Sequence, residues 1–89
     1  MTTETETRSI ATIAREIRAD WRRKDGTSAV YFGAVPYLDA MRSLDSIDDM
    51  YGYDDARSVV LYFLANANAW RGETARRVKA ELKRMAGVK

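Results

Sequence analysis

The 89-residue chain is 46% hydrophobic and 31% charged with a formal net charge of +2, a composition typical of one small globular domain and not of a disordered chain. It contains no cysteine and no histidine, which excludes disulfide frameworks, zinc fingers, thiol chemistry and imidazole catalysis. No apolar run approaches the roughly 18 residues needed to span a bilayer, and the polar start MTTETETRS predicts no signal peptide, so we expect a soluble cytoplasmic protein.

The charges are segregated along the chain. Residues 1–24 hold six basic and four acidic side chains, residues 25–57 hold two and seven, and residues 58–89 hold seven and two. One interpretation is an acidic middle that complements basic ends within the fold. The other is an exposed basic face that binds an anionic partner.

The first predicted element is a helix over residues 10–24. Apolar side chains recur at steps of three and four, which places one apolar stripe along a helix. They are Ile10, Ile13, Ile17 and Trp21. Ser9 suits the N-cap, and Gly26 suits the end because glycine tolerates the left-handed conformation. Residues 1–8 lack an apolar anchor and are predicted to be a disordered tail.

A short second helix is predicted over residues 36–44. Pro36 fits the first helical position, where its missing amide hydrogen costs nothing. Residues 27–35 are expected to be helix or coil, because a lone short strand there would have no evident partner. Gly33 permits either conformation.

The acidic segment DSIDDMYGYDD, residues 45–55, suggests a calcium loop. An EF-hand loop needs oxygen ligands at its first, third and fifth positions, Gly at the sixth and Glu at the twelfth. Counting from Asp45 or from Asp49 fails this pattern, so we expect no metal site. Instead, Asp54 or Asp55 is predicted to cap the next helix.

The third predicted helix covers residues 55–67 and is apolar nearly all round, which is typical of a central helix. Its segment VVLYFL also has strand propensity, so a strand is the alternative.

The last helix, residues 69–86, has an apolar stripe opposite an arc of arginines and lysines. Gly72 lies opposite the stripe: either it marks the true helix start, or something packs against it.

These elements predict an all-α fold, a compact bundle of about four helices, with one domain over residues 9–87. The predicted core consists of Ile13, Ile17, Trp21, Leu38, Met41, Val60, Phe63, Leu64, Trp70, Val78 and Leu82. A role in partner binding is the alternative for the two tryptophans.

Catalysis is not expected. The sequence has no phosphate-binding glycine loop, and its serines have no histidine to activate them. A chain this small also leaves little volume for a pocket of roughly 300 Å³. We therefore predict neither catalytic residues nor a cofactor.

Binding of another protein is the leading functional hypothesis, because Trp, Tyr, Met and Arg anchor protein interfaces. An aromatic cluster is expected around the second helix and the acidic loop, formed by Tyr31, Phe32, Tyr37, Met50, Tyr51 and Tyr53. The predicted protein-binding residues are Tyr51, Tyr53, Trp70, Arg71 and Gly72. A homodimer or other homo-oligomer is one alternative. Nucleic-acid binding is the other, with Arg71, Arg76, Lys79 and Lys83 as its residues.

Three segments carry a resemblance: YFGAVPYLDAM, LDSIDDMYGYDDA and YFLANANAWRGETARRVKAELKRM. Together they resemble small uncharacterised proteins of actinobacteriophages and actinobacterial prophages, over about residues 10–86. The resemblance implies a small non-structural phage product that acts on a host or viral protein in the host cytoplasm. It supplies no catalytic or binding residues.

Overall fold

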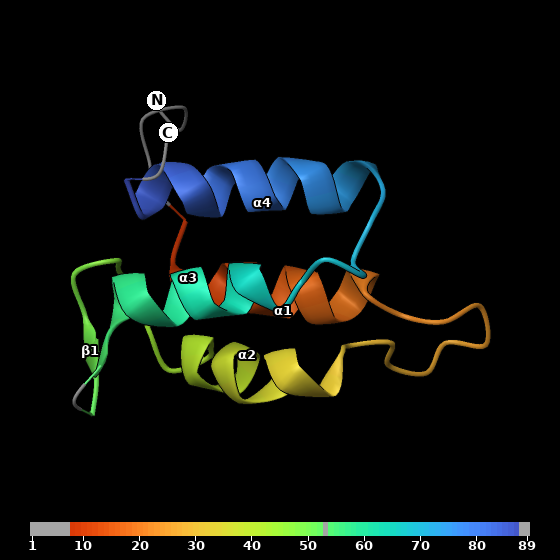
Figure 1. Ribbon diagram of the computed structural model, residues 1–89, viewed down its shortest axis with the longest axis horizontal. Coiled ribbons are helices and arrows are strands. Elements are labelled where there is room, and N and C mark those ends of the chain that lie inside the picture. Colours follow the sequence, from red (N-terminus) through yellow and green to blue (C-terminus); the bar gives the residue numbers. More distant parts are fainter. Residues whose placement is uncertain (1–7, 53, 88–89) are drawn as a thin grey trace.

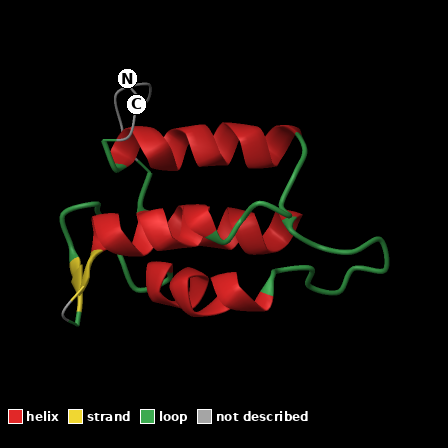
Figure 2. Ribbon diagram, viewed as in Figure 1, coloured by secondary structure: helices red, strands yellow, loops and turns green. Residues whose placement is uncertain are grey.

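The computed structural model describes residues 8–52 and 54–87, and within these residues it is mainly helical, as predicted (Figures 1 and 2). In chain order its elements are α1 (Ile10–Asp20), the 3-10 helix η2 (Phe32–Ala34), α2 (Val35–Met41), β1 (Met50–Tyr51), β2 (Asp54–Asp55), α3 (Ala56–Ala65) and α4 (Glu73–Met85). Helices α1 and α3 each pack against both α2 and α4. Figure 1 accordingly shows α1 and α3 between α4 and α2.

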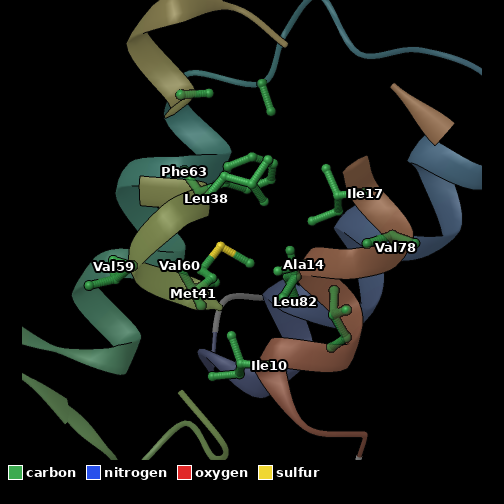
Figure 3. Packing of buried hydrophobic residues seen from close by; sticks show 14 of the residues in the cluster. Ile10, Ala14, Ile17, Leu38, Met41, Val59, Val60, Phe63, Val78 and Leu82 are labelled. Atoms are coloured by element: carbon green, nitrogen blue, oxygen red, sulfur yellow. The ribbon is translucent and has the colours of Figure 1, made fainter. Parts of the chain in front are cut away.

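The core is built from the apolar stripes of all four helices. Figure 3 shows side chains of α1 facing those of α2, α3 and α4. Every predicted core residue is buried except Leu64, which is only partly buried. The predicted core did not include the alanines that also lie inside and let the helices approach closely. They are Ala14, Ala34, Ala40, Ala56, Ala67, Ala75 and Ala86.

Two predicted caps are confirmed. The Ser9 hydroxyl accepts a hydrogen bond from the backbone amide of Thr12 at 3.1 Å, which satisfies a free donor of the first turn of α1. The Asp55 carboxylate does the same for Ser58 at 2.8 Å at the start of α3. The strand alternative for VVLYFL is wrong, since these residues lie within α3.

Helix α1 ends at Asp20 and not at residue 24. The Asp25 carboxylate accepts a hydrogen bond from the Thr27 amide at 3.0 Å, and Gly26 follows with φ +89°. This turn folds the chain back on itself, so that Arg22 bridges to Ser28 and the Ala29 amide donates to the Trp21 carbonyl at 3.0 Å. The Asp-Gly pair therefore forms a projecting loop, visible at the right of Figure 1, and does not act as a simple helix cap.

The other helices also differ in their bounds. Helix α4 begins at Glu73 and not at residue 69, because Gly72 is its N-cap. The predicted helix 36–44 ends earlier, at Met41. After it, the amides of Ser43 and Leu44 donate to the carbonyls three residues earlier, those of Ala40 and Met41, which forms turns and not a continued α-helix. Strands β1 and β2 were not predicted; they pair antiparallel around Gly52, whose φ of +63° suits a tight turn.

The predicted tail, residues 1–8, lies outside the described residues except for Arg8. None of the helices in the described part of the chain is both long and apolar enough to cross a bilayer.

Ion pairs join α1 to α4. Arg8 lies 2.8 Å from Glu16 and 2.6 Å from Glu81, and Arg77 of α4 also pairs with Glu16. Only the Arg18–Asp39 pair, among those of the described residues, joins a basic end to the acidic middle. The charge segregation is therefore not explained by complementary ends and middle; the two ends mainly pair with each other.

The ion pairs of Glu16 predict that the stability of the fold changes with pH. Burial alone would raise the pKa of Glu16, but the guanidinium groups of Arg8 and Arg77 outweigh burial and hold it below its usual 4.5. Because the folded-state pKa is lowered, this stabilisation is complete above pH 4.5 and is lost as the pH falls through the lower folded value.

Urea unfolding at a series of pH values tests this dependence. We expect Glu16→Gln to be less stable than the wild type at pH 7 and to lose less further stability on acidification. Wild type and variant both retain the acid sensitivity of Asp25 and Asp55, whose pKa values are also lowered, by hydrogen bonds from Thr27 and Ser58 respectively. Parallel curves for the two proteins would contradict the role of Glu16.

Candidate interaction surface

Four aromatic rings lie exposed or half-buried where the start of α2 meets the second half of α3. They form two pairs: Tyr31 and Phe32 with ring centroids 4.8 Å apart, and Tyr37 and Tyr62 with centroids 5.4 Å apart. Phe32 is 79% exposed, Tyr62 51% and Tyr31 45%, whereas Tyr37 is half-buried. We call these four residues the aromatic surface.

Gly33 and Asn66 lie next to both pairs. A Cβ atom on Gly33 would lie 2.6 Å from the Tyr31 ring and 3.0 Å from Asn66 Oδ1, so only glycine allows this close approach. The side-chain amide of Asn66 donates a hydrogen bond to the backbone carbonyl of Tyr62, one helical turn earlier, at 2.9 Å. Next to these residues is an open hollow of about 330 Å³, lined by Tyr31, Ala65, Asn66, Asn68 and Ala69.

The aromatic surface carries no charge. The chain has no charged residue between Asp25 and Asp39 and none between Arg57 and Arg71, and these two segments supply all four rings. Sequence reasoning placed Tyr31, Phe32 and Tyr37 in an aromatic cluster but missed Tyr62 and Asn66. The two charge-free segments are the signal that could have found them, although their proximity is a tertiary fact.

Trp70, a predicted protein-binding residue, belongs to the core. Its side chain is only 2% exposed, and its ring stacks on Trp21 with centroids 5.8 Å apart. The indole Nε1 donates to the Asp20 carboxylate at 2.8 Å, which satisfies its one polar atom. The ring is therefore not available to a partner in this fold.

The remaining residues of the predicted protein-binding site do not come together. Arg71 and Gly72 are exposed at the start of α4, while Tyr51 lies in β1 at the opposite end of the molecule (Figure 1). Tyr53 lies outside the described residues. The predicted set is thus split between two ends, separated by the length of α3.

The predicted nucleic-acid residues are better grouped. Arg76, Lys79 and Lys83 follow each other at helical steps of three and four along one side of α4, and we call them the basic stripe. Burial lowers the pKa of Lys79, and the nearby charges of Lys83 and Arg71 lower it further. Like charges therefore gather on this side of α4.

Two observations modify the basic stripe. The Lys79 ammonium donates to the Trp70 carbonyl at 2.6 Å, so it is partly committed to the fold. Glu81, an acidic residue of the same helix, pairs with Arg8 near the start of α1 and not with a cation of the stripe. The three cations of the stripe are therefore not neutralised by Glu81, but Lys79 is less available to a partner than Arg76 and Lys83.

In the described part of the acidic loop, aspartate side chains stabilise a turn and cap a helix. The Asp49 carboxylate accepts hydrogen bonds from the amides of Asp45 at 2.8 Å and Ser46 at 3.2 Å. Within residues 8–52 and 54–87, no three acidic side chains gather closely enough to hold a metal ion.

The expectation of little pocket volume is wrong. Besides the hollow beside Tyr31, a second cleft of about 440 Å³ lies between α1 and α2. Both are open to solvent.

Comparisons with protein-family models, with curated proteins and with solved structures found no match.

Gly72 is required by its backbone and not by close packing. Its φ of +111° and ψ of −179° lie in a region essentially restricted to glycine, whereas a Cβ atom there would meet nothing within 4 Å.

We expect Gly72→Ala to destabilise the domain by about 1–3 kcal/mol in urea unfolding. The neighbouring exposed substitution Arg71→Ala should stay within about 0.5 kcal/mol of the wild type. Equal stabilities for all three proteins would show that the glycine is incidental.

Proposed function

We propose that this chain is a small non-enzymatic interaction protein, a helical bundle that binds another protein through the aromatic surface. The observation that supports this most is the exposure of Phe32, Tyr31 and Tyr62, three uncharged rings of the two pairs that approach each other near Gly33 and Asn66. Full burial of one such side chain is worth about 1.5–3 kcal/mol. A partner that covers several of them would gain a substantial part of the affinity of a specific complex.

The chemistry of the surface restricts the partner. Covering uncharged rings with a bare charge would cost desolvation energy without an ion pair in return. The partner surface should therefore present apolar side chains, one of which can enter the hollow lined by Tyr31 and Asn66. The tyrosine hydroxyls then supply hydrogen bonds at the edge of the contact. Following the sequence resemblance, we propose a host or viral protein in an infected cell as this partner.

Site-specific photo-crosslinking tests the proposal. A benzophenone amino acid placed at position 32 should give one discrete adduct in cells of an actinobacterial host, whereas the same group at position 84, on the exposed end of α4, should not. Once the partner is purified, Phe32→Ser and Tyr62→Ser should each weaken binding by about tenfold or more, as expected when one anchor ring is lost. Circular dichroism should show unchanged helicity in both.

Arg71→Ala and Tyr51→Ala serve as matched controls from the two ends of the molecule. Loss of binding in these variants, with no loss in Phe32→Ser, would move the site to the residues predicted from sequence. An adduct of twice the 10.1 kDa chain mass would instead indicate self-association, the homo-oligomer alternative. Either result would overturn the proposal.

Nucleic-acid binding is the second candidate, favoured by the grouping of Arg76, Lys79 and Lys83 on one side of α4. The expected result is binding of a short DNA duplex that weakens with salt in fluorescence anisotropy. Each of Arg76→Gln and Lys83→Gln should reduce the slope of log affinity against log salt by about 1. Absence of binding at low ionic strength would remove this candidate.

A further inference from the structure

The cleft between α1 and α2 lies on the opposite side of α2 from the aromatic surface. On one side of α2, Tyr37 contacts Tyr62 of α3; on the other, Asp39 pairs with Arg18 of α1. The cleft has a volume of about 440 Å³ and is lined by Ala11, Arg15, Asp39, Arg42 and Ser43. It is therefore separate from the proposed protein-binding face.

The cleft has an excess of positive charge. The only carboxylate in its lining, Asp39, is already engaged by Arg18. Arg15 makes one long hydrogen bond of 3.3 Å to the Thr12 hydroxyl, and the guanidinium of Arg42 has no hydrogen bond or ion pair within residues 8–52 and 54–87. Two guanidinium groups, one from each wall, thus share a cleft without a counter-charge of their own.

We propose that this cleft binds a phosphate monoester. An anion between Arg15 and Arg42 would supply the missing counter-charge and accept charge-assisted hydrogen bonds from both. The Ser43 hydroxyl, just after the end of α2, adds a third donor to the lining. Donors from both sides of one cleft suit the oxygens of a tetrahedral group, whereas a planar carboxylate is satisfied by one guanidinium in a bidentate pair.

The size of the cleft favours an ester over the free ion. Volumes of about 300–1,000 Å³ are typical of sites for small organic ligands, and 440 Å³ falls within this range. A bound phosphate group leaves room for an organic substituent, which can lie against the methyl group of Ala11.

NMR titration of the full chain with phenyl phosphate tests this site. We expect saturable shifts of the backbone amides of Arg42 and Ser43 and of the Nε–Hε signals of Arg15 and Arg42. Arg15→Gln and Arg42→Gln should each weaken binding by about tenfold or more, the loss expected for one charge-assisted hydrogen bond. Both side chains are exposed, so the variants should keep the melting temperature of the wild type.

Arg84→Gln is the matched control, because it removes the same charge from an exposed position of α4. Equal weakening by Arg84→Gln would show general attraction of anions and overturn the site. Shifts that never saturate would do the same. Benzoate that binds as tightly as phenyl phosphate would contradict the tetrahedral recognition, and inorganic phosphate that binds as tightly would contradict the ester.

Discussion

The stacked pair of Trp21 and Trp70 is the contact on which the arrangement of the helices depends. Trp21 is the C-cap of α1, and Trp70 lies shortly before α4. Their stack therefore joins the segment that leaves α1 to the segment that leads into α4. The Asp20 carboxylate accepts a hydrogen bond from the Trp70 indole, and the Lys79 ammonium donates one to the Trp70 carbonyl. The Phe63 ring of α3 packs edge-on against Trp21. Both indoles are thereby buried, whereas Tyr31, Phe32 and Tyr62 are exposed.

Local signals in the sequence predicted the helices and the core. The steps of three and four that place Ile13 and Ile17 on one stripe act within a single helix, as do the caps at Ser9 and Asp55. Both kinds of signal concern residues close in sequence, and the structure confirms them. The exact helix ends were harder, because an Asp-Gly pair such as Asp25-Gly26 can either end a helix or form the turn of a loop. Here the bridge between Arg22 and Ser28 closes the loop.

The candidate surfaces could not be derived from local pattern. Tyr31 and Asn66 are far apart in sequence and meet only because α2 and α3 pack side by side. The same holds for charge: the pairing of Glu81 with Arg8, 73 residues earlier in the chain, is visible only in the fold. Trp70 belongs both to the predicted core and, as the alternative, to the predicted protein-binding residues, because a residue type that anchors interfaces also fills cores. Only its 2% exposure distinguishes the two roles.

The division between buried tryptophans and exposed tyrosines is the central claim, and photochemically induced nuclear polarisation measures it most directly. With no histidine in the chain, the signals arise from tyrosine and tryptophan side chains that the excited dye can reach. We expect Tyr31 and Tyr62 to be polarised in the isolated protein and to lose this polarisation when the partner binds, while Trp21 and Trp70 stay silent in both states. A polarised Trp70, or tyrosine signals unchanged by the partner, would contradict the account.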